Sequence, residues 1–306
     1  MPTPTAVILR ALKLGDLLVA VPALRAIRAG LPEHRLVLAT SGWLAPIVGL
    51  IGCVDEILPV SGLVALRGVV HPDVAVNLHG AGPESNALLD ALHPVRRIGH
   101  GGHGWSGPRW IDGTHERRRW CRMLRAHGFD ADPDDLLVPR PRLPSLAPGA
   151  TVIHPGAAFG SRRWPVERFA EVARAFGGTV VVTGSEHERE LALTVASVAG
   201  LPDRAALAGR IGLLEMAALV ANARLVVSAD TGIAHLSYAF GTPSVVLFGP
   251  APAEQWGPPP DGPHYSLTDP SVRRGDPFAD DADPALLAVT PAAVLAAARR
   301  ALQPWM

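Results

Sequence analysis

The chain has 306 residues, of which 48% are hydrophobic and 18% are charged, so it is long enough for two compact domains with large buried cores. Its 28 Lys and Arg residues balance its 28 Asp and Glu residues. Because a nucleic-acid backbone is bound mainly by excess positive charge, neither DNA nor RNA is an expected partner.

Apolar runs alternate with helical segments along the first half of the chain. Strands are predicted over residues 6–9, 35–40, 57–60 and 74–78. A helix is expected from the turn at 13–16 through about residue 29, and another at 115–127. Residues 36–54 carry no charge, but their Gly and Pro residues favour a strand, a turn and a short buried helix over a membrane span.

A proline-dense stretch at 139–149 is predicted to link this half to a second α/β unit. Strands are predicted there over residues 151–153, 179–183, 225–228 and 244–248. Helices are predicted over residues 166–176, 188–199, 214–223, 233–240 and 291–302, and residues 258–284 are expected to form a surface loop. The sequence thus predicts α/β domains over 1–148 and 149–306, two Rossmann-like doubly wound domains facing across a cleft.

The most informative motif runs from Ser228 to His235. A buried strand delivers Asp230, Thr231 and Gly232 to the start of a helix, where unpaired backbone N–H groups and the helix dipole favour a phosphate. His235 follows one turn later on the same face. The alternative is that Asp230 and Thr231 only cap the helix and His235 is a surface residue.

The Asp-Thr-Gly tripeptide at 230–232 also occurs in aspartic proteases. Those enzymes bring two such carboxylates together to share a proton, whereas this chain has one, in a strand–loop–helix context. The protease interpretation is therefore set aside.

Two further loops follow predicted strands of the second half. The loop at 154–165 carries Arg162 and Arg163, whose guanidinium groups suit a diphosphate, although arginines are common in this chain and both could be solvated. The loop at 183–188 carries Gly184, Glu186 and Glu188, and a carboxylate there could accept from ribose hydroxyls or could serve only as a first-turn helix acid.

In the first half, Asp16 follows the first predicted strand and enters a helix. A carboxylate in this place could take a proton from a hydroxyl, or could be a simple N-cap. The glycine-rich tract at 99–105 carries His100 and His103. Since no further ligands lie at metal-site spacing, the tract is expected to shape an acceptor pocket, and no metal is expected.

Five motifs follow one another along the chain: Leu9-Arg10 through Gly15-Asp16, Pro22-Ala23-Leu24, His154 through Pro165, Leu207-Ala208-Gly209, and Ser228 through His235. In this order they resemble glycosyltransferase family 9, the heptosyltransferase family of lipopolysaccharide core synthesis. The resemblance covers nearly the whole chain and is loosest between residues 61 and 110.

The resemblance implies a GT-B fold and an inverting transfer of a sugar, classically heptose from ADP-heptose, to an acceptor hydroxyl, without metal or cofactor. It implies Asp16 as general base and Asp230, Thr231, Gly232 and His235 as donor diphosphate and sugar ligands. Arg162 stands where the family usually has a lysine. The resemblance further implies a ribose contact from Glu188 or Glu186. The terminal helix, about 291–303, would pack back on the N-terminal domain.

Lys13 is the only lysine, and Gly and Pro number 31 and 30, a composition typical of a GC-rich genome. Many bacteria with such genomes make no lipopolysaccharide, so the acceptor could be a natural product or another surface glycan, with another nucleotide sugar as donor. A nucleotide-sugar epimerase of GT-B fold and a non-catalytic nucleotide-sugar binder are more distant alternatives. A cytoplasmic location is expected from two isolated cysteines, Cys53 and Cys121, and from the lack of a secretory signal, with peripheral membrane contact allowed.

Overall fold

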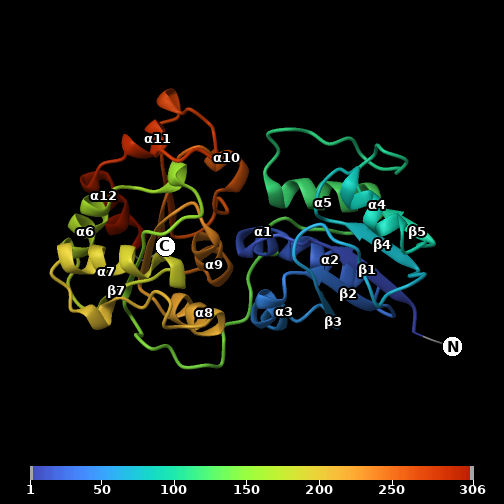
Figure 1. The fold of residues 1–306 in the computed structure, drawn as a ribbon, viewed down its shortest axis with the longest axis horizontal. Helices are drawn as coiled ribbons and strands as arrows, with labels where there is room; N and C mark the ends of the chain where they lie inside the picture. Colours follow the sequence, from blue (N-terminus) through green and yellow to red (C-terminus); the bar gives the residue numbers. More distant parts are fainter. Residues whose placement is uncertain (1–2, 304–306) are drawn as a thin grey trace. The chain divides into compact units, whose positions relative to one another are not determined.

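The computed structural model describes residues 3–303, which form two compact units that divide between Leu136 and Leu137 (Figure 1). Each unit contains a five-stranded sheet in which every neighbouring pair of strands is parallel. The predicted α/β class is therefore confirmed, with one Rossmann-like sheet in each unit. The division falls ahead of the proline-dense stretch at 139–149.

The first unit has the strand order β3-β2-β1-β4-β5. Its strands are β1 (Thr5–Leu9), β2 (Arg35–Thr40), β3 (Glu56–Pro59), β4 (Val74–Asn77) and β5 (Arg96–Ile98). Its helices are α1 (Leu14–Val19), α2 (Val21–Gly30), α3 (Ala45–Ile51), α4 (Glu84–Asp90) and α5 (Glu116–Ala126). The central strand β1 is buried on both faces, which explains its continuous apolar sequence.

The single helix expected from residue 13 to about residue 29 is wrong, because the chain forms two helices that meet at Ala20. Pro22 lies in the first turn of α2. A proline has no N–H to donate to a preceding turn, so a continuous helix through this position would lose a hydrogen bond. The uncharged segment 36–54 forms a strand, a short 3-10 turn at Gly42–Leu44 and α3, as expected.

The second unit has the strand order β10-β9-β8-β6-β7. Its strands are β6 (Thr151–His154), β7 (Val180–Val182), β8 (Leu225–Ala229), β9 (Ser244–Leu247) and β10 (His264–Leu267). Its helices are α6 (Val166–Ala175), α7 (Arg189–Val198), α8 (Leu213–Ala221), α9 (Gly232–Phe240), α10 (Ala253–Trp256), α11 (Pro284–Leu287) and α12 (Pro291–Ala301). Helices α6, α7 and α12 lie on one side of the sheet, and α8 and α9 on the other (Figure 1).

Two segments of the second unit differ from a plain loop or linker. The expected loop at 258–284 contains the edge strand β10, which pairs with β9 alone; its short length and flanking Pro and Gly residues hide it in the sequence. The proline-dense stretch is tied to the second unit at both ends, since Val138 N donates to Ala239 O and Gly149 N donates to Asn222 O.

The terminal helix α12 contacts α6, β9 and β10. Its residues Val294, Ala297 and Ala298 belong to the buried core of the second unit. The described contacts of this helix thus lie within its own unit, and its packing on the N-terminal domain stays a prediction.

The two strand orders locate the sites where a ligand can bind. In open parallel sheets, ligands bind beyond the carboxyl ends of the two strands between which the chain reverses its direction of winding. These strands are β1 and β4 in the first unit, and β6 and β8 in the second. The loops after these four strands are therefore the candidates for function. Within residues 3–303, no helix is both long and apolar enough to cross a membrane.

Candidate functional site

The loops after β6 and β8 bring together three side chains that the sequence singled out. The Arg162 Nη1 atom lies 3.7 Å from Asp230 Oδ2, and the His235 Nε2 atom lies 3.9 Å from Asp230 Oδ1. Asp230 and His235 are buried, whereas the Arg162 side chain keeps 31% of its surface exposed. The carboxylate therefore holds a cation that can still face a ligand.

Helix α9 begins beside this cluster. Thr231 is its N-cap, yet the Thr231 side chain makes no capping bond, and its hydroxyl is buried without a hydrogen-bond partner among the described residues. The ring of Trp256 lies 6.3 Å from that of His235, edge to face. A helix N-terminus with an unsatisfied hydroxyl, next to a cation, suits a phosphate group. Trp256 was not found from the sequence, because it lies far along the chain in a proline-rich segment.

The loop that carries Arg162 is held in place through the preceding residue. Ser161 is buried, its N–H donates to Ala279 O at 2.8 Å, and its hydroxyl donates to Pro277 O at 2.9 Å. The Arg163 Nε atom donates to Ala157 O at 3.1 Å, which closes the loop on itself. Arg163 is exposed and does not share the Asp230 contact of Arg162.

Beside this loop, His154 and Glu188 form a second polar cluster. The His154 Nδ1 atom is 3.0 Å from Thr183 Oγ1. Burial lowers the pKa of His154 more than the charge of Glu188 raises it. Burial raises the pKa of Glu188. Hydrogen bonds from Ser185 and the charges of His154 and Arg163 together lower it by more than burial raises it, so the pKa of Glu188 is below its usual value. The imidazole is therefore neutral and the carboxylate ionised near pH 7.

The three residues predicted to bind the nucleoside differ in their burial and in their hydrogen bonds. Glu188 Oε2 accepts from Ser185 N at 2.7 Å and from Ser185 Oγ at 2.8 Å, an arrangement typical of a capping box. Gly184 is buried beside Glu188, where an added Cβ would lie 3.0 Å from the Glu188 Cβ. Glu186 is exposed and lies against Gly209, where an added Cβ would overlap Glu186 Oε2. The ribose role of either carboxylate stays a prediction.

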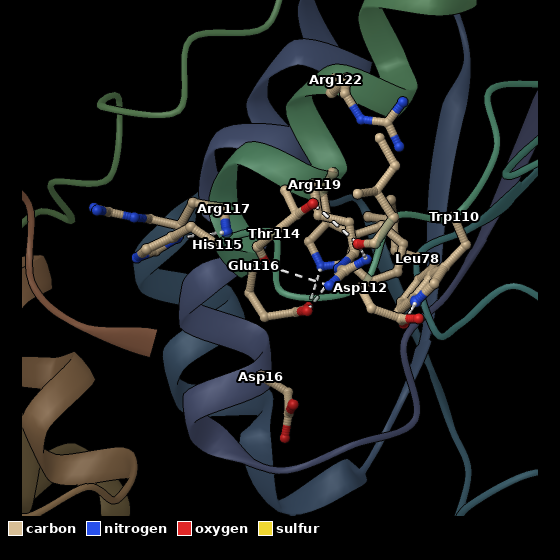
Figure 2. A network of polar contacts seen from close by, with 12 residues as sticks. Asp16, Leu78, Trp110, Asp112, Thr114, His115, Glu116, Arg117, Arg119 and Arg122 are labelled. Atoms are coloured by element: carbon tan, nitrogen blue, oxygen red, sulfur yellow. Dashed lines mark hydrogen bonds and ion pairs between the residues drawn. The ribbon is translucent and has the colours of Figure 1, made fainter. Parts of the chain in front are cut away.

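In the first unit, Asp16 lies in the first turn of α1, at the third helical position rather than at the N-cap (Figure 2). Its Oδ2 accepts from Lys13 N at 3.2 Å, and its Oδ1 lies 3.9 Å from Nη2 of the buried Arg10. The Asp16 side chain is 25% exposed. A carboxylate held on one side and open on the other can accept a proton from a bound hydroxyl.

Sequence reasoning missed the polar network after β4, the neighbour of β1. Asn77 Nδ2 donates to Ser85 Oγ at 2.8 Å and to Asn86 Oδ1 at 2.7 Å, and Asn77 Oδ1 accepts from His79 N at 2.9 Å. Burial and the charge of Arg10 lower the pKa of His79, against the charge of Asp16. His79, which is neutral near pH 7, thus follows the carboxyl end of β4, and Asp16 follows that of the neighbouring strand β1. The signal was Asn77 at the end of an apolar strand, followed two residues later by His79.

The two histidines of the glycine-rich tract lie in different surroundings. His100 is buried, its Nδ1 is 3.1 Å from Pro108 O, and its ring packs against Trp110 and Trp120. His103 is exposed, at a backbone φ of 51°. Their role toward an acceptor stays a prediction. Across residues 3–303, no three His, Cys, Asp or Glu side chains gather as a metal site would require.

The buried His100 should make stability depend on pH. Burial lowers its pKa from 6.5 to about 4, so the unfolded chain takes up the proton first. Stability contributed by the neutral ring is present above about pH 6.5 and is lost as the pH falls toward 4. We expect the Tm difference between pH 7 and pH 5 to be smaller in His100→Phe than in the parent chain.

The exposed His103 provides the matched control for this measurement. His103→Gln should keep the parent pH dependence of Tm. An identical loss of Tm between pH 7 and pH 5 in the parent and in His100→Phe would refute the assignment to His100.

We compared the chain with known protein families and with characterised proteins. Residues 137–266 match the model of glycosyltransferase family 9 (heptosyltransferase). Lipopolysaccharide heptosyltransferase 1 of Pseudomonas aeruginosa is 37% identical over 148 residues, which is 45% of this chain but only 41% of that relative. Lipopolysaccharide heptosyltransferase 1 of Salmonella typhimurium is 25% identical over 282 residues, 79% of this chain and 87% of that protein.

Solved structures agree on the fold. The structure of the ADP-heptose lipopolysaccharide heptosyltransferase II of Escherichia coli superposes with a TM-score of 0.76 at 20% identity. It covers 97% of this chain, and 98% of its own length is matched. At this identity the likeness establishes a shared GT-B fold. The fold predicted from the sequence is thereby confirmed, and the resemblance to the family is supported over residues 137–266.

Proposed function

This chain is a relative of the glycosyltransferase family 9 heptosyltransferases, and on that premise we propose that it transfers a sugar, most simply heptose, from an ADP-sugar to an acceptor hydroxyl. One observation carries the proposal: the cluster of Arg162, Asp230 and His235 at the start of α9 lies at the ligand-binding edge of the second sheet, and all three residues lie inside the family-matched segment. The acceptor is a hydroxyl of a glycan or of a natural product.

The second unit supplies what a departing diphosphate requires. When the bond between the anomeric carbon and the diphosphate oxygen breaks, negative charge grows on that oxygen. The Arg162 guanidinium and the N-terminus of α9, with the Thr231 hydroxyl, would take up this charge. Gly232, the first residue of α9, has no side chain to keep the diphosphate from its backbone.

The first unit supplies a base. As the acceptor oxygen forms its bond to the anomeric carbon, the hydroxyl proton passes to the Asp16 carboxylate. Attack on the face opposite the diphosphate inverts the configuration of that carbon. The reaction so described needs one base and one charge-stabilising site, and both come from residues of this chain. We assign the enzyme to the cytoplasm, where the free thiols of Cys53 and Cys121 persist.

A thermal-shift series with nucleotide sugars tests the donor. A ligand that binds only the folded state stabilises it by about 2.7 kcal/mol at a concentration of 100 Kd, so ADP-heptose should raise Tm in a concentration-dependent way. Arg162→Met should lose most of this shift. Arg224→Met is the control, because Arg224 contacts Thr151 and Gly177 in the same unit instead of the Asp230 cluster.

Product analysis completes the test. Release of ADP that depends on an acceptor indicates transfer, whereas an isomerised sugar without acceptor indicates an epimerase. Equal Tm shifts from ADP- and UDP-sugars would overturn the choice of nucleotide. Binding without any turnover would overturn the proposal that the chain is an enzyme.

A further inference from the structure

Arg10 is a buried arginine directly after the central strand β1. Only 1% of its side chain is exposed, and burial lowers its pKa while the charges of Asp16 and Glu116 raise it. Burying a guanidinium is costly unless its N–H groups and its charge are matched. An apolar residue at this core position would avoid the free-energy cost of burying a guanidinium, so the presence of Arg10 indicates a function for its charge or its N–H groups.

The contacts of Arg10 join three segments at the candidate site. Its Nε donates to the backbone carbonyl of Asp16 at 2.5 Å, and its Nη1 donates to the carbonyl of Leu78, directly after β4. Its Nη2 has no hydrogen-bond partner among the described residues and lies 3.9 Å from Asp16 Oδ1. Two arms of the planar fork are thus fixed on backbone, and the third extends toward the proposed base.

Helix α5 holds the guanidinium from the other side. The Arg10 carbon Cζ lies 5.0 Å from the centre of the Trp120 ring, and Trp120 Nε1 donates to Glu116 Oε2 at 3.1 Å. Glu116 also accepts from Arg119 Nε at 2.7 Å. In Figure 2 the side chains of Glu116 and Arg119 meet above Asp16, while those of His115 and Arg117 point away. The Trp120 ring thus packs on the Arg10 guanidinium, and the negative charge of Glu116 favours it.

We propose that Arg10 is a positioning residue for Asp16, which sets the backbone and the carboxylate of the base at the carboxyl ends of β1 and β4. The inference rests on the proposed function, in which Asp16 is the base. Asp16 Oδ2 accepts from the Lys13 N–H, the Asp16 backbone carbonyl accepts from Arg10 Nε, and the charged Arg10 Nη2 lies 3.9 Å from Oδ1 without a hydrogen bond, so the carboxylate is oriented and its Oδ1 stays open to a ligand. A displacement of about 1 Å of a reacting group costs roughly 100-fold in rate.

The kinetic test uses single and double variants. Arg10→Met should lower kcat by about 10- to 100-fold and leave the KM for the donor within about 2-fold, because the donor ligands lie in the second unit. Arg10→Lys, which keeps the charge but not the fork, should recover part of the loss. Arg10→Met combined with Asp16→Asn should be no slower than Asp16→Asn alone, because Arg10 acts through Asp16.

Arg28→Met is the control, because Arg28 also donates to backbone carbonyls of the first unit, those of Cys53 and His34. It should leave kcat unchanged. Multiplicative losses in the double variant, or an equal loss in Arg28→Met, would overturn the proposal. If Arg10→Met does not fold, Arg10→Lys combined with Asp16→Asn serves for the same cycle.

A measurement without turnover separates this inference from the proposed function. Hydrogen exchange over residues 14–19 should be faster in Arg10→Met than in the parent chain or in Arg28→Met, because the bond from Arg10 Nε to Asp16 O is lost. If the parent chain does not transfer sugar from an ADP-sugar, the proposed function fails and this exchange still decides the placement of Asp16. Unchanged exchange in this segment would overturn the positioning role.

Discussion

Asp16→Asn should lower the rate of sugar transfer by about 100- to 10,000-fold, the usual contribution of a general base. The amide has nearly the shape of the carboxylate, and its oxygen can still accept from the Lys13 N–H. The fold and the donor site in the second unit should therefore be preserved. The measurement is kcat with saturating donor and acceptor, together with the Tm and the shift of Tm by the donor.

The control for this substitution is Asp73→Asn. Asp73 Oδ2 also accepts one backbone N–H in the first unit, that of Thr5 at 2.7 Å, but Asp73 precedes β4 at the opposite end of the sheet. The kcat of the Asp73→Asn variant should equal that of the parent chain. A folded Asp16→Asn variant that transfers sugar at the parent rate would exclude Asp16 as the base.

Asp283→Ala should lower the free energy of unfolding of the second unit by about 2–4 kcal/mol, because buried N–H groups would lose their acceptor. Asp283 is fully buried and accepts from Gly275 N at 3.0 Å and from Ala285 N at 2.9 Å. Its own N–H donates to Ser161 O at 3.0 Å, next to Arg162. The variant should therefore also bind the donor more weakly. Urea denaturation and donor titration measure the two effects.

Asp276→Ala is the matched control, because Asp276 accepts the N–H of Phe278 at 2.9 Å in the same segment but is exposed. It should cost less than about 1 kcal/mol, since water can replace the lost acceptor. Asp283→Asn should fall between the two, because it keeps an acceptor oxygen. Equal stability of Asp283→Ala and Asp276→Ala would show that the buried carboxylate does not hold this segment.

Site residues were predicted most accurately from the sequence where an apolar run ends in polar residues. Strands β1, β6 and β8 are buried almost throughout, so each has an apolar centre and its carboxyl end is easy to locate. Asp16, Arg162 and Asp230 were selected because they follow those strands. The contact between Arg162 and Asp230 joins positions 68 residues apart and required the structure.

Side-chain burial in the first unit was not predictable in the same way. On α5, Arg117 and Arg119 are buried and Arg118 is exposed, although all three look alike in the sequence. What buries Arg119 is its ion pair with Glu116 and the Trp110 ring, 3.7 Å from its guanidinium. The folding of the preceding loop against the helix decides such cases, and composition does not report it.

The position of Lys13 allows selective labelling beside Asp16, the proposed base. Lys13 is the only lysine in 306 residues, it is exposed, and its backbone N–H is bonded to Asp16. Apart from a free α-amino group, an amine-directed fluorophore would therefore modify one side chain, three residues before Asp16. Its emission would report acceptor binding at α1 without any engineered cysteine, and in the presence of the two buried native thiols.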